Sequence, residues 1–512
     1  MLTKTDLQSM LQCQRKLWLE HYQPQCAVDE PAKQRRTTDG QTVGRYAREQ
    51  LGKDFIWPRG GEDPVVAAAA AKAQLKASPQ RAAAEVPMTF GGFYARADAL
   101  VPASHGYILR ETKAATFPLK KDKTTADTPD QHHIDDVAMQ AWVMAQAGIP
   151  LAHAELNLLD NRWRYPGAGD YSGLFRQLDV TDAAMLRQAM MPEWLAQAQH
   201  VLQGAMPQIT TGRHCSEPYS CPFLDYCKPL DPPAVEHPIE LLPDAPGKKL
   251  AKTLRENKGY ASLLEVPPEA FTGERAALYK RIQTAHRTGQ GIREPASRDA
   301  IQALPYPRYY FDFEGIDLPV PRWPGVRPYE QIPFQWSCHI ERSPGHIEHK
   351  DFIDLSGDDP SQSCLERMRT VIDPADGGPI IVYFAAYERS VLEALAQRHP
   401  RYAGLMSAYT SRLFDLLPVV KQHFYHPKMR GSFSIKKVLP AIYNDLDYEN
   451  LPGVHDGTGA QMAYLQAVFD CAGDDDKKSK LRNQLLQYCE QDTWGMVEIA
   501  YFLAHEPRPQ KP

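Results

Sequence analysis

The sequence predicts an α/β protein with two strand-containing blocks and a short helical connector between them. Its 512 residues exceed what one hydrophobic core usually supports, so two or three domains are expected. Strand-like segments alternate with helical segments on both sides of a Pro-rich stretch, KPLDPPAVEHPIELLPDAPG, which has the composition of a linker. We therefore divide the chain into residues 1–230, a linker and helical connector at 231–304, a second block at 305–505 and a disordered tail at 506–512.

The composition is typical of a cytoplasmic globular protein. No apolar run approaches the ~20 residues that a membrane-spanning helix needs, and the N-terminal MLTKTDLQSML lacks the basic start and apolar stretch of a signal peptide. Nine cysteines in such a chain are expected to be free or metal-bound rather than paired in disulfides. The net charge of −5 gives no global basic signature, so nucleic-acid binding would depend on local basic patches.

The first block is expected to begin with a helix, because Thr5 and Gln8 have the spacing of a capping box ahead of an apolar pattern. A second helix is expected at the Ala-rich segment VVAAAAAKAQLKA. Strands are then predicted at FGGFYARADALV and GYILRETKA, and helices at DVAMQAWVMAQAG and DAAMLRQAMMPEWLAQAQHVL. The block ends in a cysteine-containing loop, HCSEPYSCPFLDYC.

The second block begins with an aromatic strand that carries two acids. Strands are predicted at RYYFDFEG, PFQWSCHIE and IIVYFAA, followed by alternating helices and loops. Asp312 and Glu314 are separated by one residue, so both side chains point to the same face of the first strand. Burying two like charges is costly unless a positive group compensates them. Taken alone, the spacing leaves open whether that group is a metal ion or an Arg or Lys side chain.

Two further acids follow in the second block. Glu388 comes just after the strand-like IIVYFAA, and Asp492 lies four residues after Tyr488, which places those two side chains on one face of a helix. Taken alone, Tyr-x-x-x-Asp is more commonly a packed surface pair. In this order, however, the four carboxylates could hold two Mg²⁺ or Mn²⁺ ions, which clamp a phosphoryl centre and activate water.

This order of motifs resembles the DnaQ-like 3′–5′ exonucleases of the RNase H-like fold, in their tyrosine-bearing subgroup. The segments PYEQIPFQWSCHIE, GSFSIKKVLP and YCEQDT also resemble an uncharacterised-domain family that is found fused to RecB-like nucleases. The resemblance covers about residues 305–503 and implies that Asp312, Glu314, Glu388 and Asp492 bind metal ions. It also implies that Tyr488 orients the attacking water. DnaQ-like enzymes generally have Asp as the third acid, so Asp415, in RLFDLLPVV, is a rival to Glu388.

The segment GSFSIKK offers groups that suit a nucleic-acid backbone. Ser432 and Ser434 supply hydroxyls and Lys436 supplies an ammonium group, which are ordinary phosphate-binding groups. A turn ahead of a solvated helix face explains the same residues about equally well.

The first block carries a second set of polar residues. Glu111 and Lys113 would share one face of a strand, with Asp98 on the preceding strand, so a cation and a lysine could act together on a phosphate. In most proteins Glu-x-Lys is an ordinary ion pair. The set resembles the PD-(D/E)xK nuclease core, and Gln140 matches the glutamine often found in the RecB-like branch. Four positions after this glutamine, where RecB-like proteins usually have an aromatic residue, this sequence has Met144. The segment DGQTVGRYAREQL offers no clear match for the histidine of the first RecB-like helix.

Four cysteines form a further candidate site. Cys215, Cys221 and Cys227 are spaced six residues apart, and Cys13 lies at the other end of the block. Four thiolates suit either Zn²⁺ or a 4Fe–4S cluster, and the spacing is unlike a zinc C-x₂-C pair. The arrangement resembles the iron–sulfur RecB-like nucleases, which implies a 4Fe–4S cluster joining the first helix to the end of the domain. His214 is a possible substitute ligand.

The sequence therefore predicts a metal-dependent nuclease with two candidate sites, the C-terminal one a 3′–5′ exonuclease that acts on DNA. Three alternatives remain open: one active nuclease with the other domain only binding nucleic acid, an RNA-processing exonuclease, and a non-catalytic nucleic-acid-binding protein. DNA is preferred to RNA as the partner, although no pattern in the sequence indicates a contact to a 2′-hydroxyl.

Overall fold

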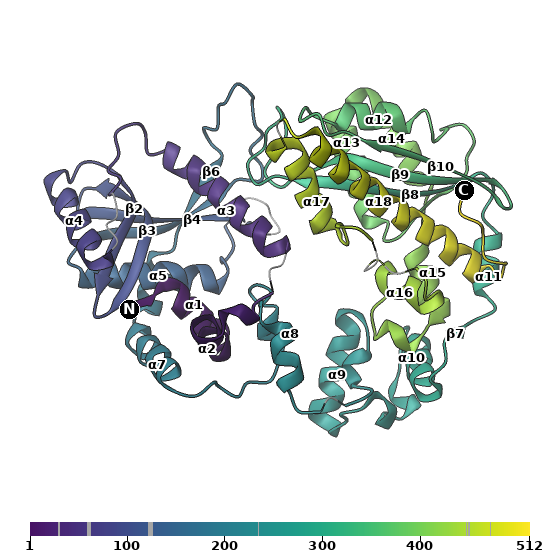
Figure 1. The fold of residues 1–512 in the computed structure, drawn as a ribbon, viewed down its shortest axis with the longest axis horizontal. Helices are drawn as coiled ribbons and strands as arrows, with labels where there is room; N and C mark the ends of the chain where they lie inside the picture. The colour runs from purple at the N-terminus through teal and green to yellow at the C-terminus, as the bar shows by residue number, and fades with distance from the viewer. Residues whose placement is uncertain are drawn as a thin grey trace. The chain divides into compact units, whose positions relative to one another are not determined.

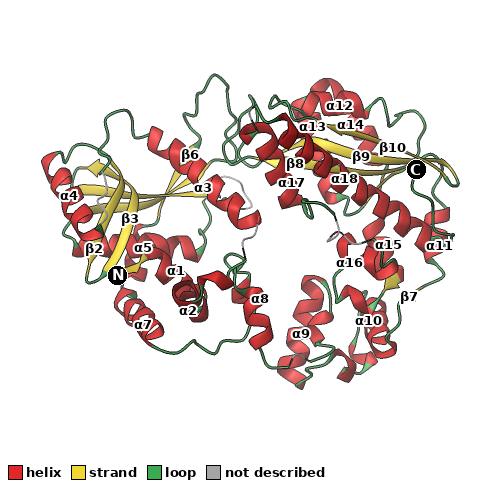
Figure 2. Cartoon of the chain, viewed as in Figure 1, coloured by secondary structure: helices red, strands yellow, loops and turns green. Residues whose placement is uncertain are grey.

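The protein is a mixed α/β chain with two mixed β-sheets, as the sequence predicts at that level (Figure 1). A computed structural model describes residues 1–28, 31–58, 63–120, 126–233, 235–446, 448, 451–471 and 473–512. The described chain forms two compact units, and helices and strands alternate in both (Figure 2). The first unit comprises residues 1–232 and 318–330, and the second comprises residues 233–317 and 331–512.

The first unit is built on a six-stranded sheet. Three antiparallel strands form its middle, β4 runs parallel to β5, and the order is β1-β3-β4-β5-β6 with β2 also paired to β3. The strands are β1 (Leu2–Thr3), β2 (Ala83–Phe90), β3 (Phe93–Ala103), β4 (Gly106–Thr116), β5 (Leu151–Leu159) and β6 (Phe175–Asp179).

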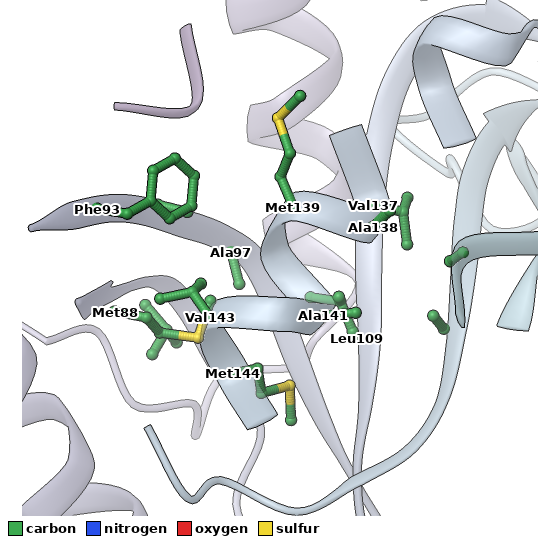
Figure 3. Close-up of a cluster of buried hydrophobic side chains, with 14 of the residues drawn as sticks. Met88, Phe93, Ala97, Leu109, Val137, Ala138, Met139, Ala141, Val143 and Met144 are labelled. Carbon is green, nitrogen blue, oxygen red and sulfur yellow. The ribbon is translucent and has the colours of Figure 1, made fainter. Parts of the chain in front are cut away.

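Helix α5 (Gln131–Gln146) connects the parallel strands β4 and β5 and packs on the sheet. Its Val137, Ala141 and Met144 are fully buried, and they belong to the same apolar core as Phe93 and Leu109 of the strands (Figure 3). A parallel pair needs such a crossover, and the apolar pattern of DVAMQAWVMAQAG supplies the face that covers it. This core fixes the strands that carry the candidate residues of the first unit.

The first unit has seven further described α-helices. They are α1 (Lys4–Gln12), α2 (Gln14–Tyr22), α3 (Pro31–Glu49), α4 (Pro64–Ala77), α6 (Thr181–Gln188), α7 (Met191–Gln203) and α8 (Leu224–Cys227).

Two expectations about these helices are wrong. The capping box of α1 is formed by Thr3 and Asp6, not by Thr5 and Gln8, because the short strand β1 ends at Thr3 and the helix begins directly after it. The segment 181–203 is two helices rather than one. Pro192 lies in the first turn of α7, where a missing N–H is tolerated, and α6 ends before it.

Residues 318–330 leave the second unit and pack within the first. The hydroxyl of Tyr329 donates to the carbonyl of Ala114 at 2.7 Å, and the N–H of Gly325 donates to the carbonyl of Tyr165 at 2.7 Å. Val320 joins a small apolar cluster of the first unit together with Leu174. This excursion is the connection between β8 (Arg308–Asp317) and β9 (Gln331–Ser343).

The second unit is built on a five-stranded sheet in the order β10-β9-β8-β11-β12. Strands β8, β9 and β10 are antiparallel, whereas β11 runs parallel to β8 and to β12. The remaining strands are β10 (His346–Ile353), β11 (Ile380–Val382), β12 (Leu413–Asp415), and the separate two-stranded pair β7 (Ile292–Arg293) and β13 (Phe424–Tyr425).

Helices cover the faces of this sheet, and the long helix α18 (Asp475–Leu503) packs across β8 and β9 (Figure 2). The helices expected to form a connector belong to this unit. The other helices are α9 (Asp244–Lys258), α10 (Ala276–Thr288), α11 (Ser297–Gln302), α12 (Ser361–Met368), α13 (Ala386–Arg398), α14 (Ala403–Ser411), α15 (Leu416–His423), α16 (Ile435–Ile442) and α17 (Gly457–Leu465), with a π-helical turn at Gln466–Asp470.

The C-terminal tail after α18 contains no helix or strand over residues 506–512. Arg508 nevertheless pairs with Glu498 at 2.9 Å and with Asp445 at 2.8 Å, and Lys511 pairs with Glu490 at 2.7 Å. The tail is thus tied to α18 by charged contacts. In the part of the chain that the structure describes, none of the helices combines the length and apolar character needed to cross a membrane.

Candidate functional site

The two faces of strand β8 have different chemistry. Tyr309, Phe311 and Phe313 belong to an apolar core with α12, α13 and α14. Because side chains alternate along a strand, Asp312 and Glu314 face the other way, toward α18. The same-face prediction for these two acids is therefore confirmed by the register of β8.

Helix α18 brings a third acid to this pair. One carboxylate oxygen each of Asp312, Glu314 and Asp492 lies within 4.8 Å of the others. Glu388, in the first turn of α13, lines the same cavity of about 560 Å³. The four acids predicted from distant segments thus meet at one site, together with Tyr488.

Neighbouring side chains hold the polar groups of this site in fixed positions. The hydroxyl of Tyr448 donates to Asp492 at 2.6 Å, and Lys436 of α16 donates to the hydroxyl of Tyr488 at 3.3 Å. Helices α16 and α18 can approach closely because residue 495 is glycine: a Cβ there would lie 2.9 Å from Leu439. Sequence reasoning missed Tyr448, because it lies 44 residues from its partner and no local pattern connects the two.

Burial raises the pKa of each carboxyl in the cluster, and repulsion by the other carboxylates adds to this effect at Asp312 and Glu314. Burial, and then the charge of Asp492, raise the pKa of Glu314 to about 8 and that of Asp312 well above its usual range. Burial raises the pKa of Glu388 to about 8. Burial likewise raises the pKa of Asp492, although the Tyr448 hydroxyl acts in the opposite direction. These groups therefore tend to hold protons until a cation takes their place.

The two rivals for the third acid have different environments. Glu388 is buried, and its Oε2 has no hydrogen-bond partner among the described residues. Asp415 instead caps α15, accepting from the N–H of Leu417 at 3.0 Å, and also accepts from the N–H groups of Phe384 at 2.9 Å and Ala385 at 3.0 Å. Asp415 is thus occupied by backbone donors, while Glu388 offers a free oxygen to the cavity.

Of the three predicted backbone-binding residues, only Lys436 lines this cavity among the described residues. Its ammonium group donates to the carbonyl of His455 at 2.7 Å and lies 5.1 Å from the ring centre of Tyr488. Ser434 is exposed at the N-cap of α16, and the hydroxyl of Ser432 accepts from the N–H of Ser434 at 3.3 Å. These serines form the turn that leads into α16.

The candidate residues of the first unit also meet, but with cations among them. Lys113 donates to Glu111 at 2.7 Å and also pairs with Asp136, and Gln140 donates to Glu111 at 2.7 Å. Lys4 of α1 pairs with Glu111 at 3.1 Å and with Asp136 at 2.8 Å. Sequence reasoning missed Lys4 and Asp136. Asp136 could have been found, because it lies one helical turn before Gln140 on α5.

These cations set the charges of the first cluster. Although burial acts in the opposite direction, Lys113 and Lys4 hold the pKa of Asp136 well below its usual range. Asp98 accepts from the N–H of Thr112 at 2.9 Å. Burial, and then the charge of Glu111, raise the pKa of Asp98 to about 7. A neighbouring cavity of about 320 Å³ is lined by Asp98, Glu111 and part of α3.

The four predicted cysteine ligands border one small cavity of about 10 Å³, together with His214. Cys215, Cys221 and Cys227 are buried in a cluster with Leu19 and Phe223, and Cys13 is partly buried. Burial raises the pKa of Cys221 to about 11 and also raises that of Cys227, so these thiols are protonated. Among the described residues, no three of the sulfurs lie within 4.8 Å of one another.

Asp130, His132 and His133 form another group whose possible ligand atoms lie within 4.8 Å of one another. They occupy the N-cap and first turn of α5, where the helix dipole is positive. The charge of Lys113 also acts on both histidines, lowering their pKa in addition to the larger effect of burial. Both imidazoles are therefore neutral at neutral pH.

Comparison with known proteins gives a family match without an activity. Residues 309–434 match a domain of unknown function, DUF2779. The chain is 27% identical over 228 residues to the uncharacterized protein UU173 of Ureaplasma parvum. This alignment covers 41% of this chain and 33% of that protein. The chain is also 27% identical over 219 residues to the uncharacterized MG366 homolog of Mycoplasma pneumoniae, and that alignment covers 40% of this chain and 33% of the homolog. The chain spans about a third of the length of these curated relatives.

Proposed function

We propose that the chain is a metal-dependent nuclease and that the cavity of the second unit hydrolyses phosphodiester bonds from a 3′ end. The observation that carries the proposal is the convergence of Asp312, Glu314 and Asp492 within 4.8 Å, with Glu388 on the same cavity. Such a carboxylate set fits hard divalent cations. The direction of cleavage and DNA as the preferred polymer rest on the resemblance to DnaQ-like exonucleases.

The proposal also assigns a specific fold to each unit. The order β10-β9-β8-β11-β12, with β9 antiparallel to its neighbours, supports an RNase H-like second unit. The pair β3 and β4, carrying Asp98 and Glu111-x-Lys113, supports a PD-(D/E)xK-like first unit.

The side chains around the cavity have separate roles in this proposal. Asp312, Glu314, Glu388 and Asp492 would hold Mg²⁺ or Mn²⁺, which when bound supplies positive charge at the phosphate and lowers the pKa of water. Lys436 adds a fixed positive charge on the same cavity. Burial and the charge of Asp492 raise the pKa of Tyr488 well above its usual range, so its hydroxyl stays protonated and can orient a water.

An end-labelled substrate assay tests the proposal. Full-length protein is incubated with Mg²⁺ or Mn²⁺ and with single-stranded and double-stranded DNA and RNA labelled at the 5′ end. We expect shortening from the 3′ end that Asp312→Asn reduces by about 100-fold or more, since loss of even an outer-shell partner costs up to that amount. The control is Asp476→Asn, the same change at an exposed position of α18. Equal activity in the two variants would refute the proposal.

Tyr488→Phe separates chemistry from metal binding. It removes only the hydroxyl, so we expect a rate about 100-fold lower with an unchanged requirement for metal. A variant that is active only at a raised Mn²⁺ concentration would instead assign Tyr488 to the metal site.

The first unit is a second candidate nuclease site, and one observation favours the alternative that it only binds nucleic acid. Lys4 and Lys113 already neutralise Glu111 and Asp136, so these carboxylates have less need of a cation. Activity that survives Asp312→Asn and disappears on adding Lys113→Ala would establish two active nucleases. No surviving activity would establish one.

We also propose a 4Fe–4S cluster at Cys13, Cys215, Cys221 and Cys227. Zn²⁺ bound by four thiolates at about 2.3 Å requires sulfurs about 3.8 Å apart. The four cysteines border one small cavity, and no three of the described sulfurs come within 4.8 Å of one another, so a compact tetrahedral zinc site is not preformed there. Protein purified anaerobically should be brown, absorb near ~400 nm and carry about four irons, and Cys13→Ala should lose them. Stoichiometric zinc without iron would refute this assignment.

A further inference from the structure

Phe384 has an unusual backbone conformation beside the acidic cavity. Its φ is 77°, in the left-handed region that bulky residues rarely adopt. The residue is also 56% exposed, so packing in the core does not explain why a large apolar residue occupies this position. Non-glycine residues held in such conformations are concentrated at functional sites.

Asp415 holds this conformation. Its two carboxylate oxygens accept from the N–H groups of Phe384 and of Ala385, at 2.9 and 3.0 Å. Asp415 ends β12 and Phe384 follows β11, and these two parallel strands are neighbours in the sheet. The turn after β11 is thus fixed from the adjacent strand end, and α13 begins directly after it.

The residues on both sides of Phe384 belong to the cavity wall. Tyr383 and Tyr387 line the cavity, as does Glu388 one position later. The hydroxyl of Tyr383 donates to the carbonyl of Phe433 at 2.7 Å, which ties the wall to the segment leading into α16. An exposed, rigidly presented ring therefore stands in the loop that carries one of the four acids.

We propose that Phe384 is a nucleotide-binding residue whose ring stacks on a base of a single-stranded nucleic-acid end. The inference rests on the nuclease function proposed above and names its substrate as an unpaired strand. Stacking on an aromatic ring is independent of sequence because every base has a π-face. The acids act on the phosphate, and Phe384 gives affinity for the base next to it.

Binding without hydrolysis tests this inference separately from the nuclease activity. Anisotropy of a fluorescein-labelled single-stranded DNA oligonucleotide is measured in the Asp312→Asn background, which prevents cleavage and removes one like charge. Adding Phe384→Ala should weaken binding about fivefold or more, as expected for loss of one stacked base. Phe384→Tyr should bind normally. An oligonucleotide with abasic 3′-terminal positions should bind equally to the protein that keeps Phe384 and to the Phe384→Ala variant.

The backbone conformation has its own test. Phe384→Gly and Phe384→Ala both remove the ring, but only glycine adopts a φ of 77° without strain. The Gly variant should therefore melt about 2 °C above the Ala variant, and both should show the same loss of binding.

Several results would overturn the inference: no binding by the Asp312→Asn protein, unchanged binding in Phe384→Ala, or an equal loss on the abasic oligonucleotide. A Gly variant that melts below the Ala variant would contradict the strained presentation of the ring. If binding depends on the Phe384 ring but the wild type cleaves no polymer, the stacking site stands and the nuclease proposal fails.

Discussion

The two acidic clusters of this chain differ in what neutralises them. In the first unit, the carboxylates of Glu111 and Asp136 are paired with Lys4 and Lys113. In the second unit, Asp312, Glu314 and Asp492 face one another, and Lys436 is directed to a tyrosine hydroxyl and a backbone carbonyl.

This difference indicates which cluster has its charges neutralised by the protein itself and which needs protons or a bound cation. Buried ion pairs satisfy their own charges, and removing one partner is strongly destabilising. Buried carboxylates without such partners keep protons or bind a cation, and they make the ligand-free protein less stable than it would be without them. We therefore expect that removing a charge from the first cluster lowers the stability of the protein, and that removing a charge from the second cluster raises it.

The largest effect is expected in the first unit. Lys113→Met leaves Glu111 and Asp136 with Lys4 alone, and breaking a buried pair costs about 3 kcal/mol. The transition of this unit in differential scanning calorimetry should fall by about 10 °C. Lys76→Met, at an exposed position of α4, is the control. Equal melting of the two variants would show that the cluster needs no such compensation.

A smaller effect of opposite sign is expected in the second unit. Glu314→Gln removes one like charge from the cavity, so in EDTA the free energy of unfolding at a pH of about 7.5 should rise by about 2 kcal/mol. The same variant should lose most of the stabilisation that Mn²⁺ gives to the wild type. Urea titrations with and without Mn²⁺ measure the two effects, and a destabilised Glu314→Gln protein in EDTA would contradict the comparison.

The stability of the second unit in the absence of metal should also fall as the pH rises and its carboxyls lose their protons. The pKa values of Glu314 and Glu388 are raised to about 8 in the folded state from 4.5. Below pH 4.5 both carboxyls are protonated in the folded and in the unfolded chain, so the folded protein has its full stability. As the pH rises from 4.5 toward 8, the carboxyls ionise in the unfolded chain before they ionise in the folded protein, and stability is lost. The melting temperature of the second unit in EDTA should fall over this range, and Glu314→Gln should flatten the fall. An increase with pH would contradict the shifts.

The smallest effect concerns the two rivals for the third acid. Asp415→Asn keeps one oxygen that can accept from the backbone, so we expect a loss of about 1 kcal/mol and unchanged Mn²⁺ affinity. Glu388→Gln should instead weaken Mn²⁺ binding clearly. Isothermal titration of both variants decides the assignment, and the reverse order of affinities would give the role to Asp415.

Local spacing predicted those parts of the site that depend on local geometry. Asp312 and Glu314 share a face because strands alternate, and Tyr488 and Asp492 share a face because an α-helix turns every ~3.6 residues. The tertiary partners could not be predicted in this way. Tyr448 meets Asp492, and Lys4 meets Glu111, only because the chain folds back over 44 and 107 residues.

Element ends were the weakest part of the sequence interpretation. The capping box was placed at Thr5 rather than Thr3, since pairing of β1 with β3 decides where α1 begins and this pairing leaves no local signal. The sequence leaves the choice between Glu388 and Asp415 open for a similar reason. An acid directly after a strand can be a ligand or a helix cap, and its backbone contacts depend on the neighbouring strand.

Thermal stabilisation by Mn²⁺ is the most direct test of the central claim that the cluster of the second unit is a metal site. Melting of the wild type, Asp312→Asn and Asp476→Asn is recorded in EDTA and at rising Mn²⁺ concentration. At about 100 times Kd, a ligand that binds only the folded state adds about 2.7 kcal/mol. We predict that the wild type and Asp476→Asn gain this stability and that Asp312→Asn does not. An equal gain in all three proteins, or no gain in the wild type, would contradict the account.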